Sequence, residues 1–246
     1  GKYVDDILVC DNHSSDRTAE IARQSGARVV FHEKQRYVTP SRRFAYTQTD
    51  SEWILSLDAD ERGTTELLKQ LKTLSDNDQC DVYRFAKLQY FFGRPMKHGG
   101  WFSEIFPQFF RRKFFLDNYR GDKEGAHFDF ESVSYAKRSF VIPKNEGAYL
   151  IHLAYDNISE FVNRAYGRYC LLEAEDRLAE GNTWSLRKIL TAPLVNFAKQ
   201  YFLKRGYMDG TRGLILAILM SHYYTLIEVN KWFLTIQKSH ENSTKG

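Results

Sequence analysis

The sequence has little cysteine and no arrangement that would join its cysteines into a known kind of site. Cys10, Cys80 and Cys170 are isolated and odd in number, and no CxxC motif or Cys/His cluster occurs. Disulfide frameworks and zinc sites both need paired or clustered ligands. We therefore expect reduced thiols in a cytosolic chain and no zinc site.

Long apolar runs and targeting signals are also missing. No signal peptide opens the sequence, and no run reaches the about 20 apolar residues that a membrane span needs. No DNA- or RNA-binding motif occurs, so nucleic acid is not an expected partner. A Gly-rich basic phosphate loop is absent near the N-terminus, which weighs against a sugar-phosphate nucleotidyltransferase.

What the sequence does contain is typical of a globular α/β protein. Its 246 residues are 43% hydrophobic and 27% charged, enough for one large domain or one domain with an appendage. The first third alternates strand and helix patterns, with Gly26 placed to end the first helix. These segments are the strands 5–11, 27–33 and 52–58 and the helices 14–26 and 40–49. This βαβαβ order predicts a mostly parallel sheet flanked by helices.

Three acidic residues crowd onto the end of the strand at 52–58. Asp58, Asp60 and Glu61 follow the apolar residues of "EWILSLDADER". Ligands of open α/β sheets bind at the carboxyl ends of strands, and like charges repel unless a cation neutralises them. The cluster therefore indicates a cation site, or else a solvated acidic turn before a helix capped by Thr64 or Thr65.

The rest of the chain divides at about residue 156. Between residues 83 and 130, 15 of 48 residues are aromatic, which indicates core strands or, alternatively, the wall of a substrate site. Amphipathic helices are expected at 157–181 and 185–206, followed by an apolar segment. We predict a catalytic domain over residues 1–156 and a helical C-terminal extension over residues 157–246.

Basic charge gathers at the C-terminal end. From Arg187 onward, nine Lys/Arg stand against three Asp/Glu, beside the apolar segment 213–233. Such a segment suits the surface of an anionic membrane, with Tyr223, Tyr224 and Trp232 at headgroup depth. A buried helix or an oligomer contact is the alternative interpretation.

Several motifs together resemble those of glycosyltransferase family 2 enzymes of GT-A fold, in particular the branch that adds sugars to the lipopolysaccharide inner core. The matching stretches are collinear between residues 6 and 234. They read "VCDNHSSDRT", "LSLDADER", "YFFGRPMKHGGWFSE", "FFRRKF", "LIHLAYDN" and "KRGYMDGTRGLILA". The family's pattern begins with a further strand and a "PTYNEE"-like loop. Gly1 begins too late to contain them, so either the chain is trimmed or its GT-A-like sheet lacks the first strand.

The resemblance implies a site for a nucleotide-sugar donor. Asp11 matches the family's contact to uracil or ribose, and Asp58 and Asp60 match its DXD motif, which binds Mn²⁺ or Mg²⁺. Arg42 is our candidate for a phosphate contact, with Arg43 or an exposed structural role as alternatives. His152 is a candidate third metal ligand, although a lone His is more often structural.

The resemblance also implies an acceptor site. Glu104, where the family has Asp, is the candidate general base of an inverting transfer, unless it is a surface residue of a loop. His98 and Trp101 are candidates for the acceptor wall. We therefore expect transfer of a sugar to a glycan or glycolipid, on the cytoplasmic face of the inner membrane, by a monomer or homo-oligomer. A non-catalytic nucleotide- or glycan-binding protein of the same fold is the alternative.

Overall fold

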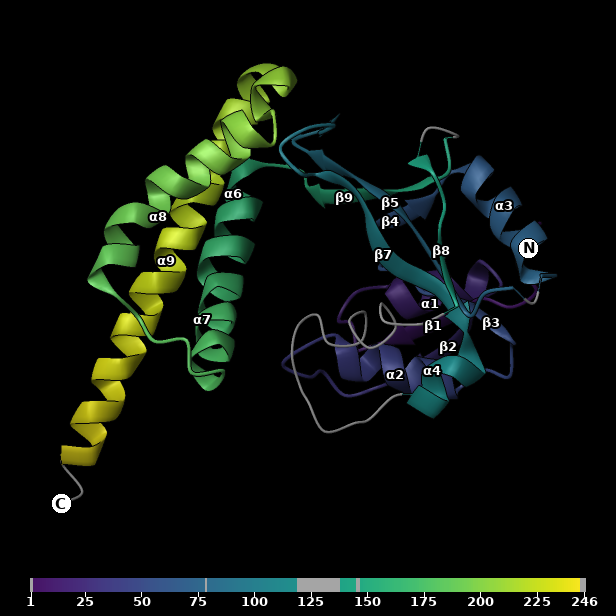
Figure 1. The fold of residues 1–246 in the computed structure, drawn as a ribbon. Helices are drawn as coiled ribbons and strands as arrows, with labels where there is room; N and C mark the ends of the chain where they lie inside the picture. Colours follow the sequence, from purple (N-terminus) through teal and green to yellow (C-terminus); the bar gives the residue numbers. More distant parts are fainter. Residues whose placement is uncertain (1, 78, 119–137, 145–146, 244–246) are drawn as a thin grey trace. The chain divides into compact units, whose positions relative to one another are not determined.

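The computed structural model describes residues 2–77, 79–118, 138–144 and 147–243, with the side chains of residues 104–106 and 241–243 excepted. Packing divides the chain into two compact units. The first contains residues 1–87 and 103–151, and the second contains residues 88–102 and 152–246. Three strands run from one unit into the other, so the units are joined through the sheet (Figure 1). The predicted functional division at residue 156 stays a prediction.

The N-terminal half of the chain has the alternation of strands and helices that the sequence predicts. The elements are β1 (Leu8–Asp11), α1 (Thr18–Gln24), β2 (Arg28–Phe31), α2 (Thr39–Thr47), β3 (Trp53–Leu55), β4 (Glu61–Gly63), α3 (Thr65–Ser75), β5 (Val82–Phe91), β6 (Arg94–Pro95), β7 (Phe102–Arg111), α4 (Arg112–Asn118), β8 (Ser139–Val141) and β9 (Tyr149–Tyr155).

Local sequence signals explain where these helices start and stop. The Asp16 carboxylate accepts the N–H of Thr18 at the start of α1, and Gly26 takes a φ of +84° just past its end. Thr64, one of the two predicted caps, accepts the N–H of Leu67 at 3.2 Å and begins α3. Side-chain capping therefore sets these boundaries as predicted.

The sheet is mixed rather than mostly parallel. β1 and β2 pair in parallel as a small sheet, as the βαβ order predicts. The larger sheet has the order β3-β7-β5-β9-β4, and β6 and β8 both pair with β5. β3 runs antiparallel to β7, whereas β8 runs parallel to β5. Long antiparallel strands from the aromatic region thus enter the sheet beside β3.

Most described aromatic residues of that region are core, which confirms the first of the two interpretations for them. Tyr83, Phe85 and Phe109 pack with Leu67 of α3 and Leu150 of β9 in one buried cluster. Period-two alternation along β5 and β7 sends these rings to the covered face of the sheet. The apolar face of α3 fixes the sheet behind the candidate site.

The second unit is built on helices. They are α6 (Ile158–Phe161), the π-helical η2 (Val162–Tyr169), α7 (Cys170–Ala179), α8 (Leu186–Ala198), the π-helical η3 (Lys199–Leu203), the 3₁₀-helical η4 (Gly206–Asp209) and α9 (Gly210–Ser243). α9 packs on both α7 and α8, as Figure 1 shows for the yellow helix. The helical C-terminal region is therefore confirmed.

α9 corrects the expectation that no segment reaches membrane-spanning length. By length and composition alone, the helix over residues 206–240 could cross a membrane, with a third of its most apolar window buried inside the structure. It also contains a fully buried Lys231, whose Nζ lies 2.8 Å from Glu228 Oε1 and 3.3 Å from the carbonyl oxygen of Thr183. This ion pair ties α9 to the loop between α7 and α8.

Candidate active site

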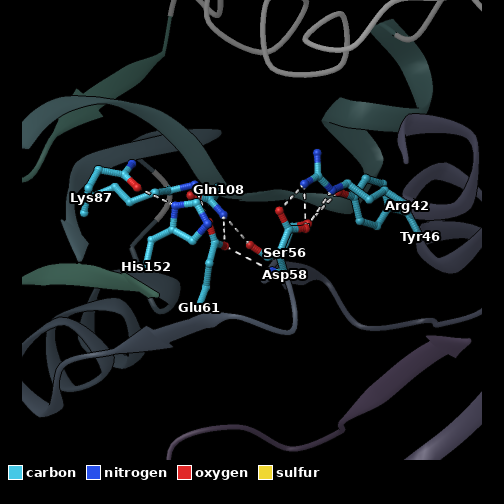
Figure 2. Close-up of polar contacts among 9 residues, drawn as sticks. Arg42, Tyr46, Ser56, Asp58, Glu61, Lys87, Gln108 and His152 are labelled. Atoms are coloured by element: carbon cyan, nitrogen blue, oxygen red, sulfur yellow. Dashed lines mark hydrogen bonds and ion pairs between the residues drawn. The ribbon is translucent and has the colours of Figure 1, made fainter. Parts of the chain in front are cut away.

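The turn after β3 is held by Glu61, one of the three acidic residues of the predicted cluster. Its side chain is fully buried and forms an ion pair with Lys87 of β5. Glu61 Oε2 accepts hydrogen bonds from Gln108 Nε2 at 2.7 Å and from the backbone N–H of Asp58 at 3.0 Å (Figure 2). Glu61 therefore has its counter-charge within the protein, and its role is to fix the turn.

A second basic residue meets the cluster from α2. Arg42 Nη2 lies 2.5 Å from each carboxylate oxygen of Asp58, and Nε lies 3.2 Å from Oδ1. The Arg42 side chain is only 14% exposed, against 36% for Asp58. Burial alone would lower the pKa of Arg42, but the Asp58 carboxylate outweighs it and raises that pKa. Arg42 thus stays charged and holds Asp58 in one orientation.

α2 is fixed to β3 at a second point one turn further on. The Tyr46 hydroxyl donates to Ser56 Oγ at 2.7 Å, in a buried contact (Figure 2). Arg42 and Tyr46 are four residues apart on one face of a helix, while Ser56 and Asp58 are two apart on one side of an extended segment. The matched spacing explains how α2 and the end of β3 form two bonds at once.

The end of β1 joins the same arrangement. Asp11 is buried, and its Oδ1 accepts from the N–H and hydroxyl of Ser14 at 3.1 and 2.5 Å. The neighbouring Asn12 Nδ2 donates to Ser41 Oγ at 2.7 Å, and Ser41 directly precedes Arg42. Asp11 and Asp58 are therefore brought to one side of the first unit by α2.

Two departures from the family pattern have structural explanations here. Asn12 stands where the pattern has a small residue, and its amide ties β1 to α2 as well as to the carbonyl oxygen of His32. His13 stands where the pattern has glycine and takes a left-handed φ of +57°, a conformation that glycine adopts without strain. Both residues thus keep the shape of the turn.

Asp60 lies on the same turn between β3 and β4 and is half-buried. Among the described residues, no three His, Cys, Asp or Glu side chains gather as a ready metal site. Mg²⁺ in proteins is commonly held by one or two carboxylates, with water and substrate phosphates as the other ligands. The oxygen donors of Asp60 and Asp58 fit that kind of site, although Asp58 would then share its carboxylate with Arg42.

His152 belongs to the second unit, as the first residue of its longer segment. It is half-buried, and its Nδ1 lies 2.5 Å from Gln89 Oε1, also in that unit. Because an amide oxygen only accepts, this contact places the proton on Nδ1 and leaves Nε2 as an acceptor. Its predicted role as a metal ligand stays a prediction.

His98 and Trp101 also lie in the second unit, on the loop after β6. The backbone N–H of His98 donates to Asp209 Oδ2 at 2.8 Å, and its Nδ1 lies 3.0 Å from Oδ1. Trp101 packs edge-to-face on Phe91, with ring centroids 4.7 Å apart. The two are therefore held on one loop, with the imidazole fixed by a nearly buried carboxylate.

Glycines allow this loop to approach η3 and η4 closely. Gly99 and Gly100 take φ values of +69° and +84°, and a Cβ on Gly100 would lie 2.7 Å from Lys204 Nζ. The N–H of Gly99 donates to the carbonyl oxygen of Lys204 at 2.8 Å. Two motif stretches far apart in the sequence, 98–101 and 204–209, thus form one surface.

Glu104 lies in β7, and its side chain is outside the described part of the protein. Its role as a base stays a prediction, as do those of Asp129 and Glu131, which fall outside the described residues. Sequence reasoning missed Lys87, Gln108 and Asp209. A polar Lys87 and Gln108 within aromatic strands is a usable signal, whereas the position of Asp209 in "GYMDGTRG" offers none beyond the motif.

Comparison with known proteins gives a consistent result. The sequence model described as "Glycosyl transferase family 2" matches residues 1–141. An uncharacterized glycosyltransferase of Rickettsia conorii is 24% identical over 250 residues, covering 98% of this chain and 83% of the relative. One from Rickettsia felis is 25% identical over 226 residues, covering 89% and 77%.

A solved structure has a similar fold. The crystal structure of Staphylococcus aureus TarS 1-349 in complex with UDP-GlcNAc superposes with a TM-score of 0.50 at 14% identity. The match covers 97% of this chain and 83% of that one. The likeness extends over both units of the chain.

Proposed function

This chain belongs to glycosyl transferase family 2, and on that basis we propose that it is a metal-dependent, inverting enzyme acting on a nucleotide sugar. The acceptor that we propose is a glycan or glycolipid of the cell surface, such as lipopolysaccharide or another envelope polysaccharide. The enzyme would work on the cytoplasmic face of the inner membrane.

One observation carries this proposal: α2 holds the ends of β1 and β3 together, so that Asp11, Arg42 and Asp58 lie on one side of the first unit. Asp60 follows on the fixed turn. In the proposed complex, Asp11 contacts the nucleoside, and Asp60, with Asp58, holds Mn²⁺ or Mg²⁺ against the diphosphate.

When bound, such a cation stabilises the charge that builds up on the leaving diphosphate. The protein's own residues orient the donor. Arg42 keeps Asp58 in place and adds a permanent positive charge beside the diphosphate, where a guanidinium is well suited to phosphate oxygens. The buried Glu61 pair keeps the turn from moving when the donor binds.

The proposal is tested by titrating nucleotide sugars with and without Mn²⁺, starting with UDP-GlcNAc, which the TarS structure contains. We expect Mn²⁺-dependent binding, and release of nucleoside diphosphate only when an acceptor glycan is present. Binding without any release across a panel of acceptors would instead indicate a non-catalytic binding protein.

We expect Glu104→Gln to lower turnover by at least about a hundredfold with donor affinity nearly unchanged, because an amide cannot take the acceptor's proton. Turnover and donor binding are measured on the same sample. Near-normal turnover would assign the base elsewhere, and Asp129→Asn and Glu131→Gln are the variants to compare next.

Asp209→Asn tests whether His98 orients the acceptor. The variant keeps the shape of the side chain but loses the charge that fixes the imidazole and the N–H of His98. We expect the acceptor KM to rise by about tenfold, since charge-assisted hydrogen bonds contribute about 1.5–3 kcal/mol. Donor affinity should stay at the parent value. A fall in kcat with no change in acceptor KM would contradict this role.

A further inference from the structure

A strongly exposed apolar surface lies on α8, η3 and η4. Its eight large apolar side chains are between 49% and 77% exposed. They are Leu186, Leu190, Leu194, Val195, Phe202, Leu203, Tyr207 and Met208. We call this the α8–η4 surface. Single exposed apolar residues are ordinary, but so many within 23 residues mark an interaction site.

The local helix geometry creates this surface. Leu186, Leu190 and Leu194 follow one another at intervals of four residues, so they lie along one face of α8. The opposite side of α8 packs on α9, so this face is not needed for the core of the second unit. η3 and η4 then continue the apolar surface beyond the end of α8.

The charge of the same segment is one-sided. Residues 182–208 contain five Lys/Arg and no Asp/Glu. Two of them, Lys204 and Arg205, directly follow the exposed pair Phe202 and Leu203. The pKa of Lys204 is lowered, first by burial and then by the charge of Lys199, which indicates that like charges are crowded here. Apolar anchors among uncompensated basic charges are the composition of a surface that binds anionic lipid.

We propose that the α8–η4 surface docks the enzyme on an anionic lipid bilayer, lying in the interface rather than crossing it. A second copy of the chain is a weaker partner, because a two-fold contact would place the five positive charges against their own copies. The docking stands on the surface itself. Only the further step, that it brings the active site to a lipid-linked acceptor, rests on the proposed function.

The proposal relocates the membrane contact that the sequence predicts. That prediction used the aromatic residues of α9, but the Tyr223 hydroxyl donates to Glu173 Oε2 at 2.6 Å inside the bundle. Burial and this carboxylate both raise the pKa of Tyr223. Tyr223 is therefore part of the packing of α9 on α7, and the exposed apolar side chains gather on α8–η4 instead.

The test is sedimentation of the full chain with vesicles of phosphatidylcholine alone or mixed with phosphatidylglycerol. We expect binding to the mixed vesicles that weakens as salt rises, because exposed charges are screened. The variant Leu190→Ser/Leu194→Ser/Leu203→Ser should reduce affinity for the mixed vesicles by at least about tenfold. The variant Arg187→Gln/Lys199→Gln should reduce it by about fivefold per charge at low salt.

The matched control is Trp232→Ser/Phe233→Ser, which removes two exposed apolar side chains of α9. Its vesicle binding should equal that of the parent. Donor binding in solution should be unchanged in all three variants, so loss of docking and failure of the proposed function give different results. The proposal is overturned if the control variant alone loses binding or if the parent binds neither vesicle. It is also overturned if light scattering finds a dimer that the triple substitution dissociates.

Discussion

Asp60→Asn is expected to abolish Mn²⁺-dependent nucleotide binding and to lower sugar transfer by about a thousandfold, with the fold intact. A divalent cation supplies several kcal/mol of charge stabilisation to a departing diphosphate, and each 1.4 kcal/mol is a factor of ten. An asparagine keeps the size of the side chain but removes the negative charge that holds the cation. Because the turn is fixed by Glu61, Lys87 and Gln108, it does not depend on Asp60.

The measurement is calorimetric titration of UDP with and without Mn²⁺, together with thermal unfolding. Asp76→Asn is the matched control, since it makes the same chemical change at an exposed carboxylate just after α3. This control should bind UDP in Mn²⁺ as the parent does. If Asp60→Asn also binds UDP as tightly as the parent in Mn²⁺, Asp60 does not hold the metal.

The sequence was sufficient for the features that local chemistry determines. Asp16, Gly26 and Thr64 define helix ends through contacts only a few residues long, so their pattern can be read directly. The antiparallel pairing of β3 with β7 could not be read in this way. It joins residues more than fifty positions apart, and a βαβαβ order is equally compatible with parallel neighbours.

The acidic cluster shows the same limit at the site. Sequence reasoning treated Asp58, Asp60 and Glu61 as equivalent charges in need of a cation. The structure separates them, because Arg42 meets Asp58 and Lys87 meets Glu61 from distant elements. Only Asp60 keeps the character that was predicted for all three. Neighbours in sequence reveal repulsion, whereas the neutralising partners depend on the fold.

Lys87→Met is expected to destabilise the protein by about 3–5 kcal/mol, the usual effect of removing one partner of a buried ion pair. Lys87 is nearly buried, and the side chain of Glu61 has no exposed surface. Without the ammonium group, Glu61 would be a buried charge with only hydrogen-bond donors around it. Urea denaturation measures the loss.

Lys113→Met is the matched control, because Lys113 forms an ion pair with Asp117 at 2.6 Å but is 85% exposed. It should lose less than about 1 kcal/mol, since solvent screens such pairs. The double variant Glu61→Gln/Lys87→Met should recover most of the stability. A neutral amide at position 61 can still accept from Gln108 and from the N–H of Asp58, and no charge remains buried. If Lys87→Met unfolds at the same urea concentration as Lys113→Met, the buried pair does not hold the turn, and the rigidity assigned to the donor site would have to come from Arg42 and Tyr46 alone.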